Sequence, residues 1–122
     1  MQMDVNNQIT QRLLTLENVL FAYLFGSYSN DTQTDRSDVD VAVYLKDITL
    51  DAQLEITYEL SKALKKDVDL VVLNSVKNIY LLEEILQKGI VLKDESSRFD
   101  FEVRGQHSIL DFKAFRKYID AA

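Results

Sequence analysis

The sequence predicts an α/β (α+β) fold in which helices pack on a small mixed β-sheet of about four strands. Short apolar or alternating runs, typical of strands, are separated by segments in which apolar residues recur at helical spacing. The length of 122 residues fits one domain with a real hydrophobic core. A composition of 47% hydrophobic and 28% charged residues agrees with a soluble globular protein and excludes disorder as the main state.

The first half of the chain predicts one helix and two strands. Helical spacing over residues 9–20 predicts an opening helix, with apolar residues at Ile9, Leu13, Leu16 and Leu20. The β-branched and aromatic run over 19–25 predicts a buried strand, and the polar segment 28–37 predicts a loop. Alternation over 38–45 predicts a second strand with valines on one face and Asp38, Asp40 and Ala42 on the other.

The middle of the chain predicts a helix and then a third strand. Either Thr49 or Asp51 can cap a helix that runs to about Lys66. Its inward apolar stripe is expected to be Leu50, Leu54, Thr57, Leu60 and Leu64. Residues 67–73 alternate around Asp69 and predict the third strand.

The last third predicts two more helices around a short strand. Asn74 or Ser75 is expected to cap a helix through Lys88, which Gly89 ends, with Ile79, Leu82 and Leu86 facing inward. A short strand over 90–92 and a polar break over 94–98 follow. Residues 99–122 are expected to end in a helix that carries Ile109, Phe112, Phe115 and Ile119.

Charge and composition exclude several classes of protein. Without cysteine, the chain has no disulfide scaffold, zinc knuckle or thiol nucleophile. A net charge of −6 with no basic stripe argues against direct nucleic-acid binding. Residues 1–11 are polar, so no signal peptide is expected, and no apolar run is long enough to span a membrane. We therefore expect a cytoplasmic protein.

The two aspartates Asp38 and Asp40 form the most informative motif, because residues two apart on a strand project from the same face. Carboxylates about 4 Å apart repel by roughly 4 kcal/mol at an effective dielectric constant near 20. A fold relieves this repulsion by exposing the pair, by protonating one member or by placing a divalent cation between them. Mg²⁺ favours carboxylate oxygens together with substrate phosphates.

Asp69 is a third candidate acid, because its apolar neighbours on the third strand make a solvated side chain unexpected there. If the second and third strands are neighbours, Asp69 approaches Asp38 and Asp40, as two-metal phosphoryl chemistry requires. Gly26-Ser27 ends the first strand, where a close backbone approach and a hydroxyl favour phosphate binding. Each feature alone has an ordinary explanation (a turn, a solvated strand end, a hydrogen-bonded acid), whereas the combination is far more specific.

These residues resemble the signature of a known family. Leu24-Phe25-Gly26-Ser27, followed by Ser37-Asp38-Val39-Asp40-Val41-Ala42-Val43, is similar to the DNA polymerase β-like nucleotidyltransferases, and in particular to the minimal nucleotidyltransferase (MNT) group. The resemblance covers about residues 10–93. It implies that Gly26 and Ser27 hold the nucleotide phosphates, that Asp38 and Asp40 bind Mg²⁺, and that Asp69 is the third carboxylate, in a site expected to take two metal ions.

The chain departs from the family after Gly-Ser. Where the family commonly has a small residue and then Arg-Gly, this chain has Ser29-Asn30-Asp31. Arg36 is a candidate replacement for the basic residue at the nucleotide, and an ordinary exposed loop arginine is the alternative. The single histidine, His107, is expected to be a surface or packing residue.

The resemblance also implies a function. We expect an MNT domain over 1–95 and a C-terminal tail over 96–122, helical and packed on the core or on a partner. MNT proteins of this size resemble antitoxins that transfer AMP from ATP to a tyrosine of a HEPN ribonuclease toxin. The expected protein is thus a Mg²⁺-dependent adenylyltransferase and antitoxin, hetero-oligomeric with a HEPN-type toxin.

Two alternatives to this function remain open. One is a non-catalytic antitoxin that acts by occluding its partner, and the other is an antibiotic nucleotidyltransferase. The tail also has two interpretations, because its aromatic residues fit either core packing or a partner-binding surface. These residues are Phe99, Phe101, Phe112, Phe115 and Tyr118.

Overall fold

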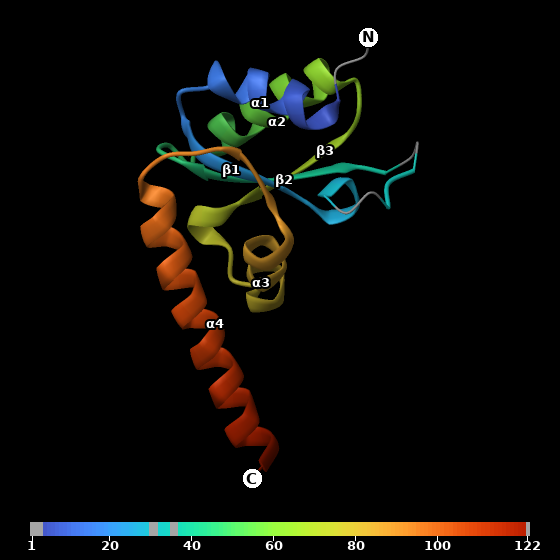
Figure 1. The fold of residues 1–122 in the computed structure, drawn as a ribbon. Coiled ribbons are helices and arrows are strands. Elements are labelled where there is room, and N and C mark those ends of the chain that lie inside the picture. Colours follow the sequence, from blue (N-terminus) through green and yellow to red (C-terminus); the bar gives the residue numbers. More distant parts are fainter. Residues whose placement is uncertain (1–3, 30–31, 35–36, 122) are drawn as a thin grey trace.

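The computed structural model describes residues 4–29, 32–34 and 37–121, and within them it has three layers (Figure 1). A mixed four-stranded sheet lies between α1 and α2 on one side and α3 and α4 on the other, which confirms the predicted fold class. The elements are α1 (Val5–Leu14), β1 (Val19–Phe25), β2 (Val39–Leu45), α2 (Leu50–Leu64), β3 (Val68–Val72), α3 (Ile79–Lys88), β4 (Ile90–Lys93) and α4 (Ser97–Ala121), with short 3₁₀ turns η1 (Gly26–Ser29) and η2 (Leu73–Ser75).

The strand order is β3-β2-β1-β4, so the two strands that carry acids are neighbours. β1 pairs antiparallel with both β2 and β4, whereas β2 and β3 are parallel. A parallel pair needs a crossover connection, and α2 supplies it between β2 and β3. This crossover brings the start of β3 back to the start of β2.

Strand alternation divides the core into two clusters. Odd-numbered residues of β2, such as Val39 and Val41, pack with α1 and α2, while Ala42 and Tyr44 pack on the side of α3 and α4. The aromatic cluster on the second side includes the stacked rings of Phe21 and Tyr44, whose centroids lie 5.0 Å apart. Asp40, the even-numbered acid of β2, therefore projects toward the α3 side.

Helix α1 begins and ends earlier than the sequence predicts. Asp4 caps it by accepting the Asn7 backbone N–H at 2.8 Å, and Thr15 ends it. The predicted extension to Leu20 is wrong because Val19 and Leu20 are part of β1, where sheet pairing replaces helical hydrogen bonds.

Helix α2 begins at the Thr49 cap, one of the two predicted, but its buried face differs from the expected stripe. Leu60 and Leu64 are buried as predicted, and Ile56 is buried with them, whereas Leu50 and Leu54 are 69% and 58% exposed. Contact with α1 and the sheet decides which part of the apolar face is inside.

Helix α3 is capped by Asn78, not by Asn74 or Ser75, and Gly89 ends it as predicted. The Asn78 side chain accepts the backbone N–H groups of Tyr80 and Leu81. Asn74 has another role: its Oδ1 accepts the Leu45 N–H and its Nδ2 donates to the Leu45 carbonyl, both at 2.9 Å. It thereby provides hydrogen-bond partners for the last backbone groups of β2, a role that no sequence pattern predicts.

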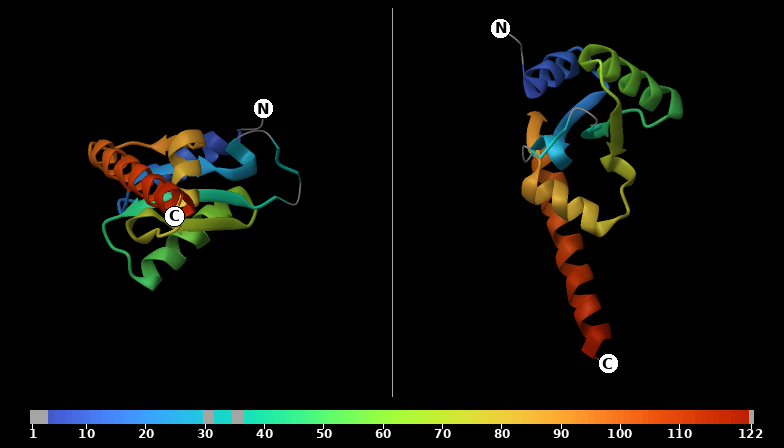
Figure 2. Two further views of the ribbon diagram at one scale, coloured as in Figure 1. Left: turned by 90° about the horizontal axis from the view of Figure 1, so that it is seen from below. Right: turned by 90° about the vertical axis from the view of Figure 1, so that its right-hand side faces the viewer.

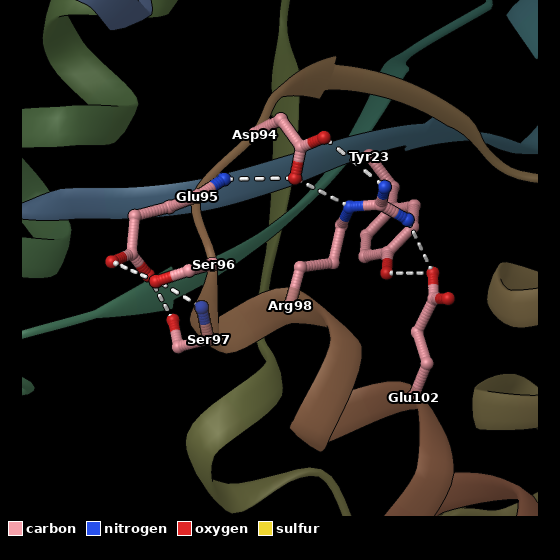
Figure 3. Close-up of polar contacts among 7 residues, drawn as sticks. All are labelled: Tyr23, Asp94, Glu95, Ser96, Ser97, Arg98 and Glu102. Atoms are coloured by element: carbon pink, nitrogen blue, oxygen red, sulfur yellow. Dashed lines mark hydrogen bonds and ion pairs between the residues drawn. The ribbon is translucent and has the colours of Figure 1, made fainter.

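Helix α4 starts at Ser97, inside the predicted polar break, and is anchored to β1 by a hydrogen-bond network (Figure 3). The Tyr23 hydroxyl donates to Glu102 Oε1 at 2.6 Å, and Arg98 donates to the same oxygen at 2.8 Å. Arg98 also donates to both carboxylate oxygens of Asp94. Burial and the neighbouring Glu102 raise the pKa of Tyr23, so its hydroxyl keeps its proton and remains a donor.

The two halves of α4 differ in burial. Phe101 and Ile109 are buried in the second cluster, as core packing predicts. Phe115 and Ile119 are 62% and 51% exposed, so core packing does not account for this part of the helix. Among the described residues, no helix is long and apolar enough to cross a membrane.

Candidate active site

The acids singled out in the sequence meet at the end of the sheet where β2 and β3 begin. Asp40 and Asp69 are directly paired across the two parallel strands, and Asp38 precedes β2. This pairing confirms the condition under which Asp69 was expected to approach Asp40. Along β2 and β3, Asp40 and Asp69 alternate with residues that pack under α1 and α2, so their side chains lie on the α3 side of the sheet. The same alternation places Asp38, two residues before Asp40, on that side.

Gly26 lies directly against Asp40. Phe25 at the end of β1 pairs with Asp40, and Gly26 then turns the chain with a φ of 74°. A Cβ at this position would stand 2.2 Å from Asp40 Oδ2, a distance that no real side chain tolerates. Glycine is therefore required both for the backbone conformation and for the close approach of the carboxylate.

Ser27 follows in the 3₁₀ turn η1, whose shape is held by local hydrogen bonds. The Ser29 hydroxyl donates to the Gly26 carbonyl at 2.7 Å, and the Thr32 N–H donates to the Ser27 carbonyl at 3.0 Å. Ser27 is thus presented at the same end of the sheet as the acids, next to Gly26. Arg36, Asn30 and Asp31 lie outside the described residues, so the expected role of Arg36 stays a prediction.

Electrostatic repulsion acts on Asp40. Partial burial is the main cause that raises its pKa, and the negative charges of Asp69, Asp38 and Glu84 raise it further. Sequence reasoning missed Glu84, because α3 carries it on the side away from the predicted apolar stripe. No signal in the sequence places this carboxylate opposite β2.

Exposure separates the central acid from the other two. Asp40 is half-buried, whereas Asp38 and Asp69 are exposed. The expectation that a solvated acid would be out of place at residue 69 is wrong, because β3 is an edge strand and Asp69 is at its open end. A substrate can therefore reach the carboxylates from solvent.

Carboxylates are the ligands that a hard cation takes, but the three acids do not form a ready-made metal site. Within 4–29, 32–34 and 37–121, no group of three or more histidine, cysteine, aspartate or glutamate side chains is arranged to hold a metal ion. A cation bound to these carboxylates would relieve the repulsion that raises the pKa of Asp40. Mg²⁺ is bound in this way in phosphoryl-transfer sites.

Lys66 brings a positive charge to this end of the sheet, a feature that sequence reasoning did not single out. Its Nζ lies 6.0 Å from the ring centre of Tyr28, the residue after Ser27. Lys65 adopts a left-handed conformation (φ 54°) at the end of α2, and this turn directs the chain into β3. A cation–π contact thus links the turn after α2 to η1.

The family described as polymerase beta, nucleotidyltransferase matches residues 7–98, three quarters of the chain. The chain belongs to this family. Membership confirms the resemblance seen in the glycine–serine and aspartate motifs. The chain is similar to a curated relative, protein adenylyltransferase MntA of Shewanella oneidensis, and the two sequences are 46% identical over 69 residues. The aligned segment covers 55% of this chain and 48% of MntA, so the match spans about half the length of that relative.

Solved structures extend the likeness of this nucleotidyltransferase over nearly the whole chain. A chain in the crystal structure of a toxin–antitoxin complex with AMP-PNP is 32% identical, with a TM-score of 0.79 and 95% of each chain covered. A chain in the structure of tri-AMPylated Shewanella oneidensis HEPN toxin with its MNT antitoxin is 27% identical, with a TM-score of 0.71. That match covers 95% of this chain and 96% of the other.

Proposed function

We propose that this chain transfers AMP from ATP to a tyrosine hydroxyl of a HEPN-type toxin and so acts as its antitoxin. The observation that carries the proposal is the direct pairing of Asp40 with Asp69, with Gly26 packed against the Asp40 carboxylate. Support for the substrate and the partner comes from similar proteins, which include an adenylyltransferase and chains of toxin–antitoxin complexes with AMP-PNP or an AMPylated toxin.

In this proposal, the chain's own residues position the nucleotide. Gly26 and Ser27 offer backbone N–H groups and a hydroxyl to the triphosphate of ATP, since a glycine leaves the backbone open to a phosphate. Arg36 and Lys66 are the candidate basic residues for the same triphosphate. Lys66 qualifies because it lies beside Tyr28 in η1.

Asp38 and Asp40 are the proposed ligands of Mg²⁺, with Asp69 as the third carboxylate of the set. When bound, the ion neutralises phosphate charge and withdraws electrons from the phosphorus that is attacked. Its binding also relieves the repulsion that raises the pKa of Asp40.

The reaction then has a simple balance. The acceptor hydroxyl oxygen forms a bond to the α-phosphorus, the bond from that phosphorus to the oxygen bridging the α- and β-phosphates breaks, and pyrophosphate leaves. Asp69 accepts the hydroxyl proton, a role that its exposure to solvent allows. Positioning and charge neutralisation provide most of the rate enhancement. A cytoplasmic site of action, where ATP and a ribonuclease toxin meet, is part of the same proposal.

The test is a labelling assay with ATP labelled on the α-phosphate, Mg²⁺ and the HEPN-type protein encoded beside this chain. The wild-type chain should label the partner, and Asp38→Asn/Asp40→Asn should not. Asp47→Asn/Asp51→Asn is the matched control, because both of these acids lie beyond the far end of β2, away from the paired acids of β2 and β3, and should leave labelling intact.

Each alternative function has its own outcome in this assay. Tight binding and inhibition of the partner without label, in both the wild type and the Asp38→Asn/Asp40→Asn variant, would replace transfer by occlusion. Label on free aminoglycosides in place of the partner would indicate an antibiotic nucleotidyltransferase.

A further inference from the structure

The C-terminal part of α4 extends beyond the rest of the molecule. Figures 1 and 2 show this helix leaving the body of the fold below α3, with its end far from the sheet. Contacts with α3 continue only as far as Arg116, which donates to the Tyr80 hydroxyl, while Lys113 forms an ion pair with Glu83. We call residues 110–121 the distal segment.

The distal segment carries large apolar side chains that no other part of the described structure covers. Every described residue from 113 to 121 is exposed. Leu110, Phe115, Tyr118 and Ile119 are 62%, 62%, 73% and 51% exposed, respectively. Since a large side chain carries about 150–250 Å², these four expose roughly 400–500 Å² of mostly apolar surface.

Such a surface is unfavourable on an isolated protein. Monomeric proteins rarely expose apolar patches larger than a few hundred Å². A short helical end also gains most of its stability from packing, and the distal segment has none beyond Arg116. The exposed area is about half of what one partner contributes to a standard interface of roughly 800 Å² per side. A second protein that covers this segment and the adjoining surface would both bury the apolar side chains and stabilise the helical end.

The comparisons indicate which kind of protein covers the segment. The family match ends at residue 98, so α4 lies outside the common nucleotidyltransferase domain. The chains from toxin–antitoxin complexes nevertheless match 95% of this chain, which includes most of α4. Helix α4 is therefore an addition to the family domain that this chain shares with chains found bound to toxins.

We propose that the distal segment of α4 is a docking arm for the toxin that the active site modifies. This inference rests on the proposed function for the identity of the partner. The recognised chemistry is an apolar groove on the partner, because Phe115, Tyr118 and Ile119 lie on one face of the helix and are the contact groups. The same segment carries two acidic and three basic residues, a net charge near zero, so salt changes the affinity little.

The experiment compares two surface variants of the full chain. Phe115→Ser/Tyr118→Ser removes two exposed aromatic side chains from the arm. Leu54→Ser/Tyr58→Ser is the matched control on α2, where the two side chains are 58% and 62% exposed. Affinity for the HEPN-type protein encoded beside the chain is measured by titration calorimetry, and AMP transfer is measured over a range of partner concentrations.

The arm variant should weaken binding at least tenfold and raise KM for the partner by a similar factor, with kcat unchanged at saturation. The α2 control should bind within twofold of wild type, and Phe115→Leu/Tyr118→Phe should restore binding to within threefold. Circular dichroism and thermal unfolding establish that each variant is folded. Equal affinities of the arm variant and wild type would overturn the proposal, as would an equal loss in the α2 control.

The active-site variant separates this proposal from the proposed function. Asp38→Asn/Asp40→Asn should bind the partner with wild-type affinity and transfer nothing. Arm-dependent binding without any AMP transfer by the wild type would remove the adenylyltransferase function and leave docking. If the arm variant transfers AMP with an unchanged KM for the partner, the docking proposal is lost and the adenylyltransferase function stands.

Discussion

Gly26 determines how closely the backbone approaches Asp40, and its replacement tests the site most directly. Gly26→Ala places a Cβ 2.2 Å from Asp40 Oδ2 at a φ of 74°, so both the carboxylate and the turn must shift. We expect a loss of about 1–3 kcal/mol in the free energy of unfolding and a fall in AMP transfer of at least about 100-fold. Urea denaturation and the labelling assay measure the two effects.

Gly105→Ala is the control for this prediction. Its Cβ would meet Leu86 Cδ1 at 2.9 Å, the mobile end of a side chain in the α3–α4 contact. Transfer should remain near the wild-type rate even if stability falls. Equal losses of activity in the two variants would show that packing, and not the geometry at Asp40, limits the reaction.

Because of Asp40, we expect AMP transfer to fall at low pH, whereas the contribution of this residue to stability falls at high pH. Burial and its acidic neighbours raise its folded pKa above the value of 3.8 in the unfolded chain. In the window between the two pKa values the folded state holds more protons, so the contribution of Asp40 to stability falls as pH rises. AMP transfer should instead decline as pH falls through the raised pKa, because the proposed cation needs the carboxylate.

Asp40→Asn should therefore abolish transfer and yet be more stable than wild type at neutral pH. The difference in the free energy of unfolding should shrink as pH falls toward and below 3.8, because the wild-type carboxyl then becomes protonated in both states. Denaturation curves between pH 4 and 8 test this, with the exposed Asp111→Asn as control. A loss of stability at neutral pH would contradict the repulsion described at Asp40.

Among the elements, β2 depends on a side chain that closes its end. Asn74 makes two hydrogen bonds of 2.9 Å to the backbone of Leu45. Asn74→Ala should lower the free energy of unfolding by about 1–3 kcal/mol, since each bond contributes about 0.5–1.5 kcal/mol. Asn74→Asp keeps an acceptor for the Leu45 N–H and should lose less than Asn74→Ala. Urea denaturation at pH 7 gives both values.

Helical faces are the elements that the sequence predicts least well. In the predicted stripe of α2, Leu60 and Leu64 are buried, but Leu50 and Leu54 are exposed and Ile56 is buried in their place. In α4 the two interpretations of the aromatic tail are divided between the halves, and Phe101 and Ile109 of the anchored half are buried in the core. The apolar periodicity of α4 continues to Ile119, but α3 does not extend along α4 as far as Ile119, so that part of the apolar face is uncovered.

At the scale of the whole molecule, α4 should contribute to stability only through its first half. A chain that ends after Arg116 should lose less than about 1 kcal/mol of unfolding free energy, because the removed residues are exposed. A chain that ends after Glu95 also loses Phe101 and Ile109 from the second cluster. Removing each such side chain costs about 2–5 kcal/mol, a large part of a typical stability of 5–15 kcal/mol.

Thermal unfolding of the two shortened chains measures this difference and also tests the predicted boundary between 1–95 and 96–122. Full stability of the 1–95 chain would show that the first 95 residues are an independent domain. Aggregation or unfolding at 25 °C would show that α4 completes the nucleotidyltransferase core.

The sequence by itself determined the strand–helix order, the family and the acids of the candidate site. These are local properties: period-two alternation defines β2, and Gly26-Ser27 with Asp38-Val39-Asp40 is a motif of neighbours along the chain. The pairing of Asp69 with Asp40 was conditional on β2 and β3 being adjacent, and the topology met that condition.

Only the tertiary structure decided which surfaces meet. It placed Glu84 opposite Asp40, made Asn74 a partner of β2, chose the buried stripe of α2 and left the distal segment of α4 uncovered. Each of these facts depends on residues far apart along the chain, whose contacts are fixed by packing area and crossing geometry. Local periodicity shows that a helix has an apolar face, but the neighbour that covers this face is set by the fold as a whole.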